Sequence, residues 1–140
     1  MDISKLYDIA EENEIDIDYF PMMAATSIAT PYGVAIDLDK LNTSADEKAC
    51  LAHELGHCMT GAFYSVKTLE TRGRMEERAN RWAIYRLVPI RRLLNAVKSG
   101  ITEKWELADY FDVPESFVDV ATRFYFSALN YKTGNCGTLR

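Results

Sequence analysis

Two histidines and a glutamate stand close together near the middle of the sequence, in the segment His53-Glu54-Leu55-Gly56-His57. If this segment is helical, the two histidines lie one turn apart on the same face. Their imidazole nitrogens can then reach one zinc ion at about 2.0–2.1 Å, while the carboxylate of Glu54 can hold a water molecule on that metal. The chain has only two histidines, so this spacing favours one metal site over two ordinary surface or core histidines.

A catalytic zinc ion usually has three protein ligands and one open position, so the histidines need a partner. No third histidine exists, and the next long helical segment offers two adjacent carboxylates, Glu76 and Glu77. Glu76 shares a helix face with Asn80 and Ala83, which favours Glu76 as the ligand and Asn80 as a hydrogen-bonding partner of the ligands. Glu77 shares its face with Arg81 and suits an exposed ion pair, but Glu77 and carboxylates elsewhere stay alternatives.

The three cysteines, Cys50, Cys58 and Cys136, indicate a reducing compartment, because an odd number matches no framework of paired disulfides. Cys58 follows His57 directly and points about 100° away around the helix, which favours a small buried residue over a ligand. The amino terminus has no signal-peptide pattern, and no uncharged run approaches the length of a membrane span. We therefore expect a cytoplasmic protein without a membrane segment.

The HExxH segment lies in a helix that we predict to begin with a capping box formed by Ser44 and Glu47. This helix is expected to run to about Met59 or Thr60 and to end at Gly61. Before it, the sequence pattern predicts a short amino-terminal helix and a small sheet. These elements are a helix from Ile3 to Ala10, a strand over residues 15–20, and a hairpin of strands 27–29 and 34–36.

After the HExxH helix the periodicity predicts four more helices, over about residues 74–88, 90–99, 103–111 and 114–129. Pro89 and Gly100 end the first two, and residues 131–140 form a tail that we expect to fray. At 140 residues the chain has room for one core. The predicted fold is therefore a mostly helical α+β single domain over residues 1–140, with a small amino-terminal β-sheet packed on the HExxH helix.

The charge balance argues against nucleic-acid binding. Sixteen basic and 21 acidic residues give a formal net charge of −5, which repels a phosphate backbone. Residues 103–124 have a helix-turn-helix rhythm, but they carry six carboxylates against two basic side chains, Lys104 and Arg123. We therefore assign this hairpin to the scaffold or to protein contacts.

Several of these segments together resemble the ImmA/IrrE family of zinc metallopeptidases. The matching segments are Ala52 to Cys58, Thr60 to Tyr64, Glu76 to Ala83, Leu87 to Pro89 and Leu107 to Pro114. The resemblance covers about residues 35–124 and implies a zincin-like fold. It implies that Glu76, which opens the pattern Glu-x-x-Ala-Asn, is the third zinc ligand. One departure is Trp82, where many members have phenylalanine.

The resemblance also implies a biological setting. Members of the family typically occur in mobile elements, such as phages, or in stress pathways, and often lie beside a helix-turn-helix repressor that they cleave or inactivate. The expected function is that of a zinc endopeptidase with one zinc ion. Its expected substrate is a protein, for example a repressor of this kind. The alternative is a non-catalytic zinc-binding regulatory protein that sequesters its partner, which would tolerate replacement of Glu54.

In the peptidase hypothesis, Glu54 acts as the general base and later protonates the leaving amine. Tyr64 is a candidate donor to the oxyanion, although a packed aromatic side chain explains this residue as well. Peptide substrate is expected to add as an extra strand to an exposed edge, for which residues 34–36 are the candidate. The same pattern also describes an interior strand that does not contact substrate.

Overall fold

The computed structural model describes residues 1–63 and 69–135. Within these residues the chain forms six α-helices and one three-stranded sheet, which confirms the mostly helical α+β fold. The chain divides into two compact units, Met1–Leu87 and Val88–Arg140, with the boundary next to Pro89. The single domain over residues 1–140 stays a prediction. Of the predicted tail, residues 131–135 are helical, and residues 136–140 lie outside the described residues.

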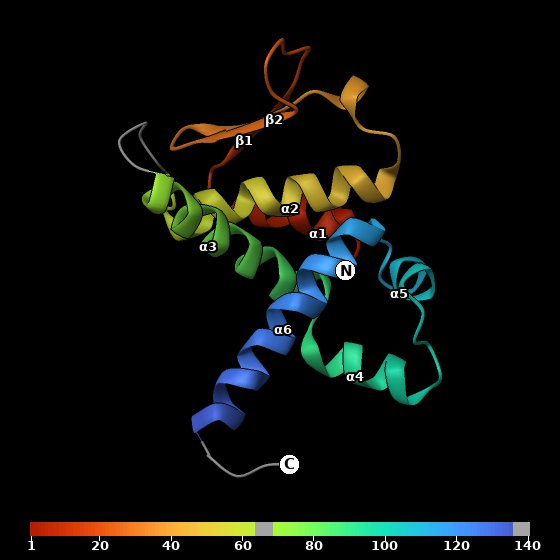
Figure 1. The fold of residues 1–140 in the computed structure, drawn as a ribbon. Helices are drawn as coiled ribbons and strands as arrows, with labels where there is room; N and C mark the ends of the chain where they lie inside the picture. The colour runs from red at the N-terminus through yellow and green to blue at the C-terminus, as the bar shows by residue number, and fades with distance from the viewer. Residues whose placement is uncertain (64–68, 136–140) are drawn as a thin grey trace. The chain divides into compact units, whose positions relative to one another are not determined.

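The amino-terminal unit contains the sheet and three α-helices, of which α2 and α3 are long (Figure 1). Its elements are α1 (Ile3–Glu12), β1 (Asp16–Tyr19), β2 (Ser27–Thr30), β3 (Gly33–Ile36), the short 3-10 helix η1 (Leu38–Lys40), α2 (Ser44–Thr60) and α3 (Leu69–Leu87). The sheet packs on one side of α2, and α3 packs on another. The expected sheet on the HExxH helix is therefore present, and α3 begins earlier than the predicted start at Arg74.

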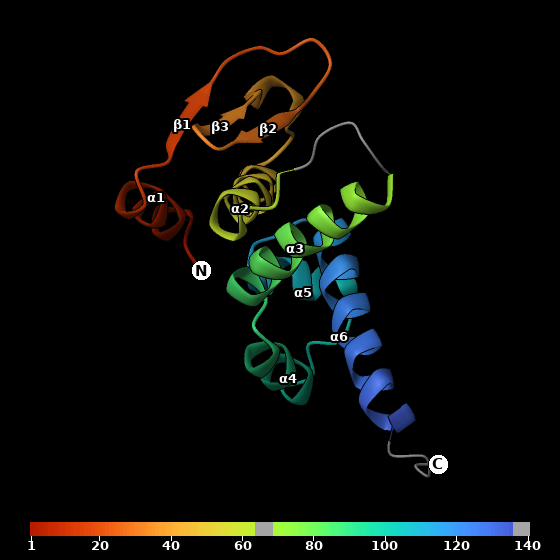
Figure 2. The same cartoon turned by 90° about the vertical axis from the view of Figure 1, so that its left-hand side faces the viewer.

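The strand order is β1-β3-β2, so β3 is the central strand (Figure 2). β3 pairs parallel with β1 and antiparallel with β2, and its Val34 and Ile36 are buried. The expectation that residues 34–36 form the exposed edge is therefore wrong. The hairpin pattern predicts that β2 and β3 pair, but it does not specify on which side β1 adds. Because β1 adds to β3, β2 is the free edge next to the hairpin.

The N-cap of α2 is Thr43, one residue before the predicted cap at Ser44. The Thr43 hydroxyl accepts a hydrogen bond from the Asp46 backbone N–H, while the Asp46 carboxylate accepts one from the Thr43 N–H. The Ser44–Glu47 capping box is therefore wrong, since two overlapping patterns of the same type compete there and Thr43 has the extended backbone of an N-cap. Gly61 ends the helix in the left-handed conformation, as predicted.

Most of the buried side chains of the amino-terminal unit come from α1, β3, α2 and α3. They include Leu6, Val34, Ile36, Leu51, Leu55, Ala79, Ala83 and Leu87. At one point the two long helices approach so closely that only glycine fits. A Cβ atom on Gly56 of α2 would lie 2.5 Å from the backbone oxygen of Ala79 in α3. This approach brings the middle of α3 against α2.

In its described residues, the carboxy-terminal unit consists of helices and the turns that join them, without a strand. Its helices are α4 (Ile90–Lys98), α5 (Lys104–Phe111) and α6 (Glu115–Asn135). α5 packs against α6, and the Tyr125 hydroxyl donates a 2.8 Å hydrogen bond to the backbone oxygen of Val88. α6 continues past the predicted end at Leu129. Among the described helices of the chain, none has both the length and the apolar composition needed to cross a membrane.

Candidate metal centre

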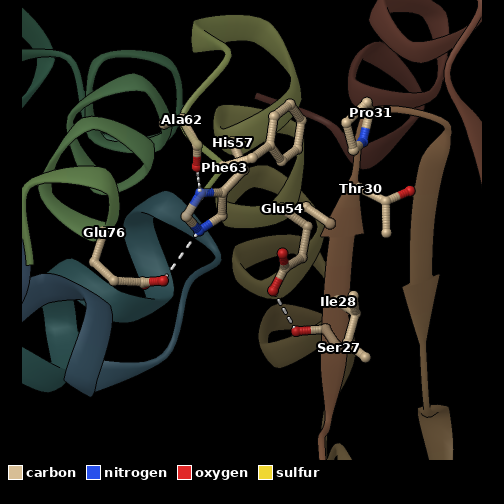
Figure 3. Close-up of a pocket in the computed structure, with 10 residues that line it drawn as sticks. Ser27, Ile28, Thr30, Pro31, Glu54, His57, Ala62, Phe63 and Glu76 are labelled. Atoms are coloured by element: carbon tan, nitrogen blue, oxygen red, sulfur yellow. Dashed lines mark hydrogen bonds and ion pairs between the residues drawn. The ribbon is translucent and has the colours of Figure 1, made fainter. Parts of the chain in front are cut away.

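Three side chains from α2 and α3 converge on one point. The Nε2 atom of His53 lies 2.9 Å from one carboxylate oxygen of Glu76, and Nε2 of His57 lies 3.2 Å from the other. The three ligand atoms lie within 4.8 Å of one another. Both histidines come from one face of α2, and Glu76 comes from the first turns of α3. Figure 3 shows the approach of Glu76 to His57.

The second nitrogen of each histidine is held by a hydrogen-bond acceptor. Nδ1 of His53 lies 2.7 Å from Oδ1 of Asn80, and Nδ1 of His57 lies 2.6 Å from the backbone oxygen of Ala62. An amide oxygen can only accept, so each Nδ1 carries the proton and donates it. In a neutral ring the lone pair then lies on Nε2, the atom that faces Glu76.

This arrangement fits a metal cation. Two imidazole nitrogens and a carboxylate face one another, so a cation between them would meet three ligand atoms at once. Histidine ligands of metals typically donate their other ring N–H to an oxygen, as both rings do here. The donor set of two nitrogens and one oxygen suits zinc, and in the described part of the chain the group has three members, which leaves a ligand position open.

Glu54 lies beside this group and is not a member of it. Its side chain is buried, with 7% of the residue exposed. The hydroxyl of Ser27, on the edge strand β2, donates a 2.5 Å hydrogen bond to Oε1 of Glu54, as Figure 3 shows. The carboxylate is therefore held between the metal-binding face of α2 and the free edge of the sheet.

A cavity of about 350 Å³ joins these parts of the site. It is lined by the edge strand and the turn after it, by residues of α2 and of the segment that follows α2, and by Glu76 of α3. The lining residues are Ser27, Ile28, Ala29, Thr30, Pro31, Glu54, His57, Ala62, Phe63 and Glu76. A substrate in this cavity would therefore contact the strand, the buried carboxylate and the metal group together.

The structure also places the other residues that the sequence singled out. Asn80 contacts His53, the role expected of it. Glu77 is exposed and lies outside the metal group, and over the described residues it forms no ion pair with Arg81, so that expectation is wrong. Two long exposed side chains gain little by pairing, because ordering them costs entropy. Tyr64 lies outside the described residues.

Cys58 does not join the metal group. It is half-buried, and its thiol lies 3.6 Å from the backbone oxygen of Thr30. Burial raises the pKa of the Cys58 thiol, and the negative charge of Glu54 raises it further. The thiol therefore stays protonated at neutral pH, which disfavours metal binding, as the sequence led us to expect.

Sequence reasoning missed three residues that shape the site, namely Ser27, Gly56 and Ala62. Gly56 had a visible signal, because a glycine inside a helix often marks a close packing contact. Ala62 acts through its backbone oxygen, so its side chain carries no signal. Ser27 lies in a strand far from the motif in sequence, and only the folded sheet brings it to Glu54.

A glutamate between two histidines one turn apart, with a carboxylate from the next helix, defines a metal centre of the metallopeptidase class. The chain belongs to the Peptidase_M78 family, described as the IrrE N-terminal-like domain, whose model matches residues 10–123. This match includes every residue of the centre and confirms the resemblance to the ImmA/IrrE family. A search of curated proteins found no match.

Proposed function

We propose that this protein is a zinc-dependent endopeptidase that hydrolyses a peptide bond in a protein substrate. The observation that carries the proposal is the convergence of His53, His57 and Glu76 beside the buried carboxylate of Glu54, in a cavity that opens on a strand edge. Membership of a peptidase family supports it.

The zinc ion would be held by Nε2 of His53, Nε2 of His57 and the carboxylate of Glu76. When bound, zinc would supply a Lewis acid that polarises the scissile carbonyl and makes water a nucleophile at neutral pH. The Nδ1 hydrogen bonds to Asn80 and Ala62 would keep both rings in the tautomer that offers Nε2.

Glu54 would carry the proton. Its carboxylate would accept a proton from the attacking water and then deliver it to the nitrogen of the leaving amine. General acid–base catalysis of this kind typically contributes about 10²–10⁴ in rate. Burial of Glu54 limits the water around the carboxylate, so its proton is passed to the substrate more readily than to solvent.

The edge strand β2 would bind the peptide. The Asp37 N–H donates to the Thr26 oxygen, so the alternation of antiparallel hydrogen bonds turns the backbone groups of Ser27 and Ala29 away from β3. These groups face the free edge, where an extended peptide can pair with them through main-chain hydrogen bonds. β2 also lines the cavity, so the paired peptide would pass beside Glu54.

The proposed substrate is a helix-turn-helix repressor of a mobile element or stress pathway, encountered in the cytoplasm. Support for this setting comes from the ImmA/IrrE family and from the segments of the sequence that resemble it. The acidic net charge of −5 also suits a protein partner better than direct binding of nucleic acid.

The test compares the natural protein with Glu54→Gln at equal zinc occupancy, measured by mass spectrometry. The assay follows cleavage of the repressor encoded beside the protein or co-purifying with it. We expect the natural protein to cut and Glu54→Gln to lose at least about 100-fold in rate while keeping its zinc. Glu77→Gln is the matched control, since Glu77 is exposed and outside the metal group, and it should cut normally.

Two results would contradict the proposal. If Glu54→Gln cuts as fast as the natural protein, Glu54 is not the base. If all three proteins bind zinc and the repressor but none cuts it, the regulatory binding protein replaces the peptidase as the better account.

A further inference from the structure

The side chain of Ser27 reaches from the edge strand β2 to the buried carboxylate of Glu54. We propose that Ser27 is a positioning residue, which fixes one oxygen of Glu54 so that the other faces the cavity and the reacting groups. This inference rests on the proposed peptidase function and deepens it, because it links the strand that binds peptide to the group that moves the proton.

The Glu54 carboxylate needs such a partner. A buried carboxylate without hydrogen bonds is costly, and a glutamate side chain has three rotatable bonds through which it can turn away. Among the described residues, the Ser27 hydroxyl is the one group that donates a hydrogen bond to Glu54. A hydrogen bond to a charged acceptor is stronger than a neutral one, so a single contact of 2.5 Å can select one orientation.

Ser27 is itself held by the sheet. It pairs with Ile36 of the central strand β3, and the Ile36 side chain is fully buried. The backbone at Ser27 is therefore anchored. The same backbone faces the free edge, while the side chain faces Glu54 on α2. A peptide that pairs with the Ser27 backbone would therefore be aligned against the residue that aligns the base. This coupling would set which peptide bond lies at the metal.

A merely structural hydrogen bond would predict a different outcome from a positioning one. Loss of a structural bond would weaken folding and lower zinc binding and substrate binding together. Loss of a positioning bond would lower the rate of the bound complex, while zinc affinity and KM stay the same, because main-chain pairing does not depend on the hydroxyl. The KM-against-kcat split therefore separates the two roles.

The experiment uses Ser27→Ala, Ser27→Thr and the control Ser99→Ala, in the full-length protein with zinc bound. Ser27→Thr restores the hydroxyl and suits a strand. Ser99, which follows α4, also donates through its hydroxyl, to the backbone oxygen of Asn95 in that helix, and it lies outside the proposed machinery. Measured quantities are kcat, KM, zinc affinity, and the side-chain carboxyl ¹³C signal of Glu54, assigned through its loss in Glu54→Gln.

We expect Ser27→Ala to lower kcat about tenfold, with KM and zinc affinity within about twofold of the natural values. Its Glu54 carboxyl signal should move. Ser27→Thr should restore both the rate and the signal, and Ser99→Ala should change neither. An unchanged kcat in Ser27→Ala would overturn the inference, and so would equal losses of kcat, zinc affinity and substrate affinity.

The carboxyl signal keeps this inference separate from the peptidase proposal, since it needs no cleavage. If the natural protein cuts nothing, but the signal moves in Ser27→Ala and returns in Ser27→Thr, the peptidase proposal fails and the positioning contact is supported. If the signal stays the same in Ser27→Ala, the positioning contact is refuted whether or not the protein cuts.

Discussion

The two histidines of the metal centre are oriented in different ways. Nδ1 of His53 donates to a side chain, that of Asn80, whereas Nδ1 of His57 donates to the backbone oxygen of Ala62. The second contact depends on the turn at Gly61, which ends α2 in the left-handed conformation and brings the chain back over the helix end. One ring orientation is therefore set by a replaceable amide and the other by the path of the main chain.

At the same scale, Glu76→Gln and Glu77→Gln form a matched pair. We expect Glu76→Gln to weaken zinc binding by more than the roughly 10–100-fold that is typical for loss of a ligand's hydrogen-bonding partner, because a ligand and its charge are lost. Glu77→Gln should leave the affinity unchanged, since Glu77 is exposed and outside the group. Competition with a chelator of known affinity measures both. The reverse order would place the third ligand at Glu77.

Much of this site could be predicted from the identity and spacing of a few residues. The spacing of His53 and His57 predicts a shared helix face, and helix geometry favours Glu76 over its neighbour Glu77. These arguments work because they depend only on the 3.6-residue repeat. The contacts of Ser27 and Ala62 could not be predicted in this way, because they depend on how a strand and a turn fold back on α2.

At the scale of elements, the distance between α2 and α3 decides whether the metal centre forms. Gly56→Ala would place a Cβ atom 2.5 Å from the backbone oxygen of Ala79, and backbone cannot give way as a flexible side chain can. We expect α3 to shift away, the zinc affinity to fall at least about tenfold, and the protein to unfold more easily by about 1–3 kcal/mol.

Gly73→Ala in α3 is the control for Gly56→Ala. A Cβ atom at Gly73 meets nothing within 4 Å, so alanine there should keep the zinc affinity and stabilise the helix by up to about 1 kcal/mol. Zinc titration and urea unfolding of both variants measure these effects. If Gly56→Ala binds zinc normally, close approach at this point is not what positions Glu76.

The segment between β3 and α2 is anchored by Asp37, which is 4% exposed. The hydrogen bond from the Met22 backbone N–H is the main cause that holds the pKa of Asp37 below its usual value, with smaller contributions from the Asp39 N–H and Lys40. A lowered pKa in the folded state means that ionisation of Asp37 stabilises the fold at pH values above the unfolded pKa of about 3.9.

This stabilisation is lost as the pH falls through the lower, folded pKa of Asp37. We therefore expect Asp37→Asn to unfold at lower urea concentration than the natural protein near pH 6, and the difference to shrink towards about pH 2. Both chains should be zinc-free, so that loss of metal in acid does not contribute. A difference that is constant with pH would show that the charge of Asp37 does not matter.

At the scale of elements, prediction from the sequence is limited where two local patterns compete. Thr43 with Asp46 and Ser44 with Glu47 both fit a capping box, and only the extended backbone at Thr43 decides between them. The hairpin of β2 and β3 follows from the turn residues between them, since that pairing is local. The central place of β3 depends on its long-range pairing with β1, which no local pattern specifies.

At the scale of the whole molecule, all three residues of the metal group lie within the compact unit Met1–Leu87. Two of them come from α2 and the third comes from α3, so a bound metal would join the two helices. Zinc bound there stabilises only the state in which both helices are packed. Binding should therefore be linked to folding of this unit.

The last prediction concerns this linkage. At a free zinc concentration about 100 times the dissociation constant, the folded protein should gain about 2.7 kcal/mol, seen in calorimetry as a higher unfolding temperature that a chelator reverses. His53→Ala should show no such gain, whereas Glu54→Gln should keep it, because Glu54 lies outside the metal group. An equal gain in His53→Ala would place the zinc elsewhere. A loss in Glu54→Gln would show that this carboxylate helps to hold the metal, and cleavage by that variant could then no longer separate the base from the ligands.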